Sequence, residues 1–259
     1  MMKQPVYSFV QERIGYLVLN RPEKRNALNK EMVEAMKSIL TDLATNDSVK
    51  IIVIKAMGKV FCSGADLESL QDMQSNTYDE NLEDSRSLKD LFYQIYTCKK
   101  IVIAQVQGHA LAGGCGLATV CDFVFSVSHA KFGYTEVKIG FIPAIVKVFL
   151  LRKIGEGKAK QLLLDADPVS AEEAKDLGLI NWIVEESNLG KKVFDYAQKL
   201  ATQNSGMAMG LTKEMIGRVQ EKSLEEGLEY AASMNAKARN SLDCKKGIAA
   251  FLNKESLSW

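Results

Sequence analysis

Short runs of apolar, mostly β-branched residues recur along the first 185 residues and predict strands. They lie at Ile14–Leu19, 50–55, Ile101–Val106, 122–127 and 180–184. Between them, residues 30–44 and 84–96 carry apolar side chains at the spacing of one helix face. Asn29 is a suitable N-cap for the first of these helices. Alternating strands and helices predict an α/β core with mainly parallel strands.

The strand pattern ends near residue 185, and the composition becomes richer in Lys, Glu, Ala and Met. Four helices are predicted after it, at 189–201, 205–219, 224–238 and 241–253. We therefore expect two parts, an α/β core at 1–185 and a helical region at 186–259. The helical region would pack on the core or on a neighbouring subunit.

Composition narrows the class of protein. The 259 residues carry 33 basic and 32 acidic side chains, a net charge of +1. This balance gives no reason to expect binding to nucleic acid or to a membrane surface. The five cysteines form no C-x-x-C pair and their number is odd, which favours free thiols. Without an apolar signal segment in the first ten residues, the expected location is cytoplasmic.

The stretch 101–127 is apolar enough to resemble a membrane helix. Glutamines and several glycines interrupt it, so a buried strand, a glycine-rich turn and a buried helix fit better. Its centre, G-H-A-L-A-G-G-C-G-L-A at 108–118, lacks both the G-K-[ST] ending of a phosphate loop and G-x-G-x-x-G. A helix N-terminus there would offer free N–H groups to an anion, although close packing of small residues explains the glycines equally well.

Three further segments are weak signals when taken singly. R-P-E-K-R-N-A-L at 21–28 follows a strand and suits a turn into a helix. F-C-S-G-A-D-L at 61–67 combines a flexible glycine with a helix start. F-G-Y-T-E-V-K-I-G-F-I-P-A at 132–144 sets Glu136 among apolar residues, where a carboxylate of raised pKa could both donate and accept protons. An ordinary surface glutamate is the alternative. No group of residues has metal-ligand spacing, so no metal is expected.

Taken together, the four segments resemble the enoyl-CoA hydratase/isomerase (crotonase) superfamily in order and spacing, over essentially the whole chain. The resemblance implies a crotonase-like ββα superhelix followed by a C-terminal helical trimerisation region, with trimers or hexamers as the expected assemblies. It implies an acyl-CoA thioester as substrate, with coenzyme A as part of the substrate and no separate cofactor. The backbone N–H groups of Ala65 and Gly113 match the two donors of the oxyanion hole, and Glu136 matches a catalytic glutamate.

The resemblance also implies a set of CoA-binding residues. They are Lys24, Arg25 and Ala27 in the first loop, Ser63, Asp66 and Leu67 in the second segment, and Phe251 and Lys254 in the tail, which would reach a neighbouring subunit's CoA.

Two positions depart from the common pattern. Two-glutamate hydratases of the family carry a glutamate where this chain has Gly116, and their I-P-G-x-G-G segment is here I-P-A-I-V-K at 142–147. Bacterial methylglutaconyl-CoA hydratases resemble the chain in both respects, so a 2-enoyl-CoA hydratase is favoured, with a branched or carboxylated acyl group. Lys147 would face such a carboxylate or only solvent. A double-bond isomerase that uses one glutamate is the alternative, and a non-catalytic acyl-CoA-binding protein is the second alternative.

Overall fold

A six-stranded sheet forms the centre of the computed structural model, which describes residues 4–259. In spatial order its strands are β1 (Val6–Gln11), β2 (Ile14–Leu19), β3 (Ile51–Ala56), β4 (Ile101–Val106), β6 (Phe123–Ser126) and β9 (Trp182–Ile183). Only the β1–β2 pairing is antiparallel. All six residues of β2 are buried, because layers cover both faces of the central strands and favour continuous apolar runs.

A second, smaller sheet contains β5 (Ala110–Leu111), β7 (Lys131–Gly133) and β8 (Val169–Ser170). The chain runs from β4 into β5 and then a helix, and from β6 into β7 and further short helices. Each of these two turns therefore adds one strand to each sheet before helices return the chain, whereas the turns after β2 and β3 contribute only isolated bridges beside the small sheet. This coiled ββα arrangement confirms the fold that the resemblance implies.

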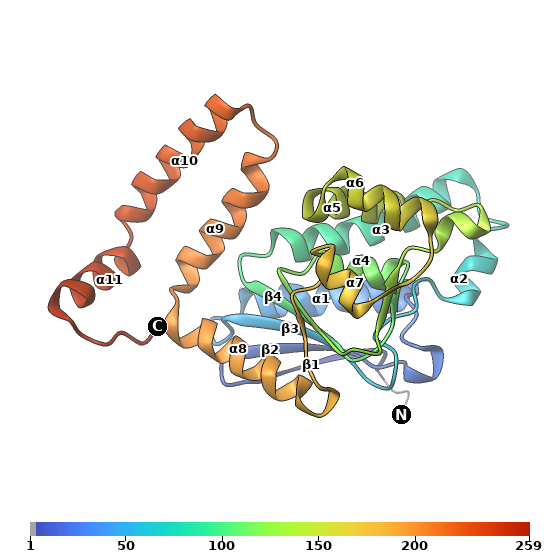
Figure 1. Ribbon diagram of the computed structural model, residues 1–259, viewed down its shortest axis with the longest axis horizontal. Coiled ribbons are helices and arrows are strands. Elements are labelled where there is room, and N and C mark those ends of the chain that lie inside the picture. Colours follow the sequence, from blue (N-terminus) through green and yellow to red (C-terminus); the bar gives the residue numbers. More distant parts are fainter. Residues whose placement is uncertain (1–3) are drawn as a thin grey trace.

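Most helices of the core lie on one side of the large sheet (Figure 1). They are α1 (Lys30–Thr45), α2 (Leu67–Asp72), α3 (Tyr78–Thr97), α4 (Gly113–Thr119), α5 (Ala144–Ile154), α6 (Glu156–Lys160) and α7 (Ala171–Asp176). Asn29 caps α1 as predicted, since its side chain accepts a hydrogen bond from the Met32 N–H at 3.0 Å. The five cysteines are free thiols, as expected.

The C-terminal helices divide into two groups by packing. Helix α8 (Leu189–Gln203) buries Val193, Ala197 and Ala201 and lies along the sheet (Figure 1). Helices α9 (Gly206–Val219), α10 (Leu224–Arg239) and α11 (Leu242–Asn253) form an arm. The arm is joined to the core through α9, where Lys213 pairs with Asp122 at 2.7 Å, and extends away from it beyond that contact. The composition thus changes near residue 186, whereas the packing changes near the start of α9.

The apolar stretch 101–127 contains β4, β5, α4 and β6 rather than one long helix. Within residues 4–259, no helix combines the length and the apolar character needed to cross a membrane. Strand β1 was not predicted. It is an edge strand whose last four residues are exposed, so its sequence lacks the continuous apolar run of the central strands.

Candidate active site

The segment 61–66 lies between two other parts of the chain. On one side, the Leu28 N–H donates to the Gly64 carbonyl at 2.7 Å and the Asp66 N–H donates to the Leu28 carbonyl at 2.9 Å. On the other side, the Leu111 N–H donates to the Cys62 carbonyl at 3.0 Å. Leu28 and Ala65 thus form an isolated parallel bridge, in which the N–H of Ala65 points away from Leu28. It has no backbone acceptor within the described chain, and Ala65 is exposed.

Gly113 begins α4, directly after a sharp turn at Ala112, whose φ is 48°. The first N–H groups of a helix have no partner within it and carry the positive end of its dipole. Gly64, at a φ of 95°, brings the two donor segments into contact: a Cβ built on it would lie 3.6 Å from the Gly113 nitrogen. The structure therefore places the Ala65 and Gly113 segments side by side.

Glu136 follows β7, which runs parallel to β5 and pairs Gly133 with Leu111. Both strands consequently leave the small sheet at the same edge, one towards Gly113 and the other towards Glu136. Glu136 begins a short 3-10 helix, η2 (Glu136–Ile139). Its Oε2 atom is buried and has no hydrogen-bond partner within the described residues. This desolvation raises the pKa of Glu136 above its ordinary value, the direction predicted from its apolar surroundings.

Cys115 on α4 lies near Glu136. The buried Cys115 thiol lies close enough to Glu136 for the carboxylate charge to raise its pKa. Burial is the main cause and takes the pKa of Cys115 to about 12. Cys115 is therefore a packing residue, and the helix start does not activate it as a nucleophile.

The side chain of Asp66 is buried between the first loop and the second segment. It is 2% exposed, accepts a hydrogen bond from the Glu68 N–H at 3.1 Å, and lies 2.9 Å from Arg21 Nη2. The Arg21 contact is an ion pair rather than an aligned hydrogen bond. The Asp66 carboxylate thus fixes the first loop to the second segment and is not available to a ligand.

Asn26, which the sequence suggested only as a turn residue, holds the first loop in place. Asn26 is fully buried, donates to the carbonyls of Met57 and Val60 at 2.8 Å each, and accepts from the Arg21 N–H at 2.9 Å. The fold leaves Lys24 and Arg25 exposed on this loop. No sequence pattern identifies these acceptors, because Met57 and Val60 contribute only backbone atoms.

The remaining predicted CoA residues fall into two places. The Ser63 N–H donates to the Arg25 carbonyl at 3.2 Å, Leu67 is exposed, and Ala27 is buried with its carbonyl bound by Arg21. These residues adjoin Lys24, which pairs with Glu68 at 3.0 Å. Phe251 and Lys254 lie instead at the end of α11, distant from α2 and α4 of the same chain (Figure 1).

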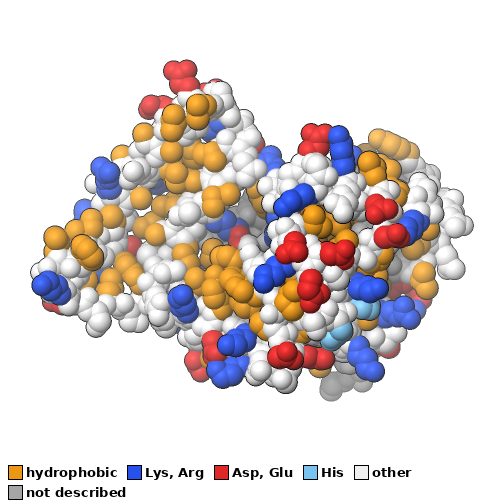
Figure 2. All heavy atoms as spheres, viewed as in Figure 1, with side chains coloured by type: hydrophobic (Ala, Val, Ile, Leu, Met, Phe, Trp, Pro, Cys, Tyr) orange, Lys and Arg blue, Asp and Glu red, His pale blue; other side chains and the backbone are white. Residues whose placement is uncertain are grey.

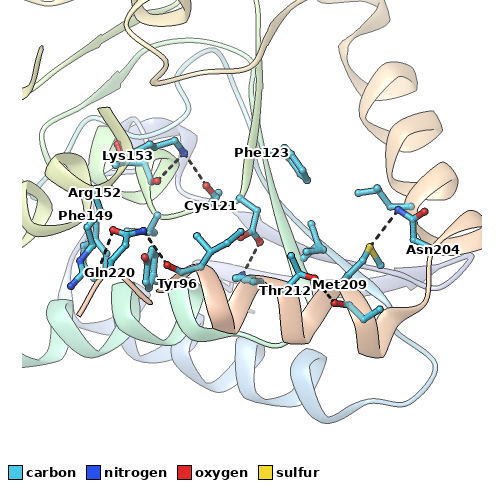
Figure 3. A pocket seen from close by; sticks show the side chains of 18 of the residues that line it. Tyr96, Cys121, Phe123, Phe149, Arg152, Lys153, Asn204, Met209, Thr212 and Gln220 are labelled. Atoms are coloured by element: carbon cyan, nitrogen blue, oxygen red, sulfur yellow. Dashed lines mark hydrogen bonds and ion pairs between the residues drawn. The ribbon is translucent and has the colours of Figure 1, made fainter. Parts of the chain in front are cut away.

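A cavity lies away from these groups. It has a volume of about 760 Å³ and lies between α9 and the core, with Tyr96, Phe149, Lys153 and Met209 among its lining residues (Figure 3). Lys153 donates to the Thr119 and Cys121 carbonyls at 2.9 Å each, at the C-terminal end of α4. None of the predicted site residues lines this cavity. No cluster of three or more metal-ligating side chains occurs within residues 4–259.

The coiled ββα fold thus brings the Ala65 and Gly113 segments and the partly buried Glu136 carboxylate to one edge of the small sheet. Residues 10–259 match the family model for enoyl-CoA hydratase/isomerase, and the chain belongs to this family. It is 41% identical to a Thermus thermophilus protein provisionally named as an enoyl-CoA hydratase, over 93% of the chain and 95% of that relative. It is 33% identical to the crotonyl-CoA hydratase of Syntrophomonas wolfei, over 96% and 95% of the two chains. The crystal structure of enoyl-CoA hydratase from Mycobacterium smegmatis superposes with a TM-score of 0.93 at 28% identity, over 99% of both chains.

Proposed function

We propose that this enzyme adds water to a 2-enoyl-CoA, or removes it in the reverse direction, with Glu136 as the single acid/base group. The observation that carries the proposal is the desolvated Glu136 carboxylate at the sheet edge from which Gly113 and its N–H also emerge. The similarity to relatives named as hydratases supports hydration over other reactions of thioesters.

In this mechanism the thioester carbonyl oxygen accepts hydrogen bonds from the N–H groups of Ala65 and Gly113. These bonds strengthen as negative charge develops on that oxygen, which stabilises an enolate. Water forms a C–O bond at Cβ and loses a proton to Glu136. Glu136 then returns a proton to Cα as the enolate collapses. Water is thereby added across the double bond, and no redox cofactor takes part.

An isomerase that moves a double bond between the 3- and 2-positions is the second candidate. It is favoured by Gly116, because the α4 position that would carry a second carboxylate has no side chain. Moving a proton between Cα and Cγ needs only one carboxylate.

A direct assay separates the two reactions. The purified enzyme is incubated with crotonyl-CoA, 3-hexenoyl-CoA and 3-methylglutaconyl-CoA, and product mass and enoyl-thioester absorbance are followed. We expect a 2-enoyl-CoA to gain the mass of one water. Conjugation of 3-hexenoyl-CoA without a mass change, and no hydration of either 2-enoyl substrate, would instead establish the isomerase.

The acyl group is proposed to be branched or carboxylated, as in methylglutaconyl-CoA. Its support is the I-P-A-I-V-K segment, which replaces small residues with bulkier ones in α5. Lys147 is exposed on this helix, so a carboxylated acyl group would have to reach the surface to pair with it. Preference for 3-methylglutaconyl-CoA over 3-methylcrotonyl-CoA would show that the distal carboxylate is recognised.

Assembly into trimers or hexamers is proposed from the arm. Hydrophobic side chains cover parts of its surface (Figure 2), and Leu224, Leu242 and Phe251 are each more than 80% exposed. Exposed apolar surface of this kind favours burial against another protein surface. The measurement is the molar mass in solution by light scattering.

The pH dependence follows from the raised pKa of Glu136. The carboxylate form must accept the first proton, so kcat/KM is expected to fall as the pH drops through the pKa of the free enzyme. Because burial raises this pKa, the fall begins above the ordinary value of 4.5. A kcat/KM profile for crotonyl-CoA that stays flat down to pH 4.5 would contradict a desolvated Glu136 as the base.

A further inference from the structure

Gly116 on α4 faces Val146 on α5 at very short range. A Cβ built on Gly116 would lie 2.3 Å from Val146 Cγ1 and 3.0 Å from Phe92 Cε2. Val146 is 4% exposed and Phe92 is fully buried. A β-branched side chain in a helix has essentially one χ1 rotamer, so Val146 cannot rotate away. A side chain at position 116 would therefore force Val146 or the backbone of α4 and α5 to shift.

Position 116 is also where a second side chain would reach the reacting atoms. Gly113 and Gly116 are three residues apart in α4, so they share one face of the helix. Helical side chains point back towards the N-terminus, and a side chain at 116 would extend over the turn that carries the Gly113 N–H. The volume that such a side chain would need is filled by Val146 and Phe92.

We propose that Val146 is a specificity-determining residue, which excludes a second carboxylate and so limits the acid/base chemistry to Glu136. Gly116 and the 142–147 segment, the two places where the chain departs from the two-glutamate hydratases, are then linked. The larger side chain of Val146 on α5 occupies the space that a side chain at position 116 on α4 would need. The wall next to the oxyanion site becomes apolar, so water is held for reaction by Glu136 alone. This inference rests on the proposed function, but its packing part can be tested independently.

The test is a double-mutant cycle with G116E, V146G and the double variant G116E/V146G. We expect G116E alone to lower Tm by about 5 °C or more, because a glutamate side chain would be forced against Val146. V146G should recover most of that loss in the double variant by freeing the space. We also expect the double variant to hydrate crotonyl-CoA at least about tenfold faster than V146G alone, because two carboxylates can divide the proton transfers.

V148G is the matched control. Val148 lies two residues further along α5 and is 50% exposed, so V148G introduces the same helix-weakening glycine without freeing space at position 116. G116E/V148G should therefore recover none of the Tm lost in G116E.

Two outcomes would overturn the proposal. One is equal recovery of the Tm of G116E by V146G and by V148G, which would mean that Val146 does not exclude a side chain at position 116. The other is recovered Tm without faster hydration, which would make Val146 a packing residue only. Failure of the proposed function is distinguishable, since it requires a wild-type enzyme that hydrates no 2-enoyl-CoA, whereas the Tm recovery and the activity gained by G116E/V146G are compared among variants.

Discussion

Replacing Glu136 with glutamine is expected to lower kcat/KM for crotonyl-CoA by about 10²- to 10⁴-fold, the usual contribution of a positioned acid/base group. Glutamine has nearly the same shape but cannot accept a proton, so substrate binding should change little and kcat should carry the loss. The measurement is steady-state hydration by the decrease in enoyl-thioester absorbance. E172Q is a suitable control, because Glu172 is exposed on α7. Full activity in E136Q would exclude Glu136 as the catalytic group.

E136Q should lower activity but raise folding stability at neutral pH. Burial raises the folded-state pKa of Glu136, so the native state binds more protons than the unfolded state between pH 4.5 and that raised pKa. The contribution of Glu136 to the free energy of unfolding therefore decreases as the pH rises through this range. E136Q should be more stable than the wild type at pH 7, and this advantage should disappear below pH 4.5. Denaturant unfolding at both pH values measures it.

The sequence predicted those features that depend on local pattern. The β2 and β4 strands have the predicted bounds because continuous apolar runs indicate strands buried on both faces. A glycine-rich turn between a strand and a helix was predicted within 108–118, and the resemblance placed the helix start at Gly113, where α4 begins. Matching all four segments to one family then indicated which backbone groups would converge.

Features that depend on contacts between distant segments could not be predicted in this way. The resemblance placed Asp66 beside CoA, and only the fold shows that Arg21 lies beside its carboxylate. Gly116 and Val146 appeared as two separate departures, although a Cβ at one would collide with the other. Periodicity and spacing describe each segment alone, whereas the fold determines which segments meet.

Loss of the Arg21–Asp66 ion pair should have the largest effect on stability. Asp66 is 2% exposed, so R21M would leave a buried charge without its partner. Removing one member of such a pair typically costs about 3–5 kcal/mol of unfolding free energy. R86M is the matched control, since Arg86 pairs with Glu83 at 3.7 Å on the surface and should cost less than about 1 kcal/mol.

The Arg21–Asp66 pair should also affect catalysis, because Asp66 directly follows Ala65. If Asp66 moves to reach solvent, the Ala65 N–H leaves its place opposite Gly113, and loss of one oxyanion donor typically lowers kcat by about 10²- to 10³-fold. The double variant R21M/D66N removes the unpaired charge, and the asparagine side chain that it introduces can still cap α2. It should therefore regain most of the stability and kcat lost in R21M. If R21M and R21M/D66N were equally impaired, the loss would come from the missing Arg21 contacts to the first loop and not from the buried charge.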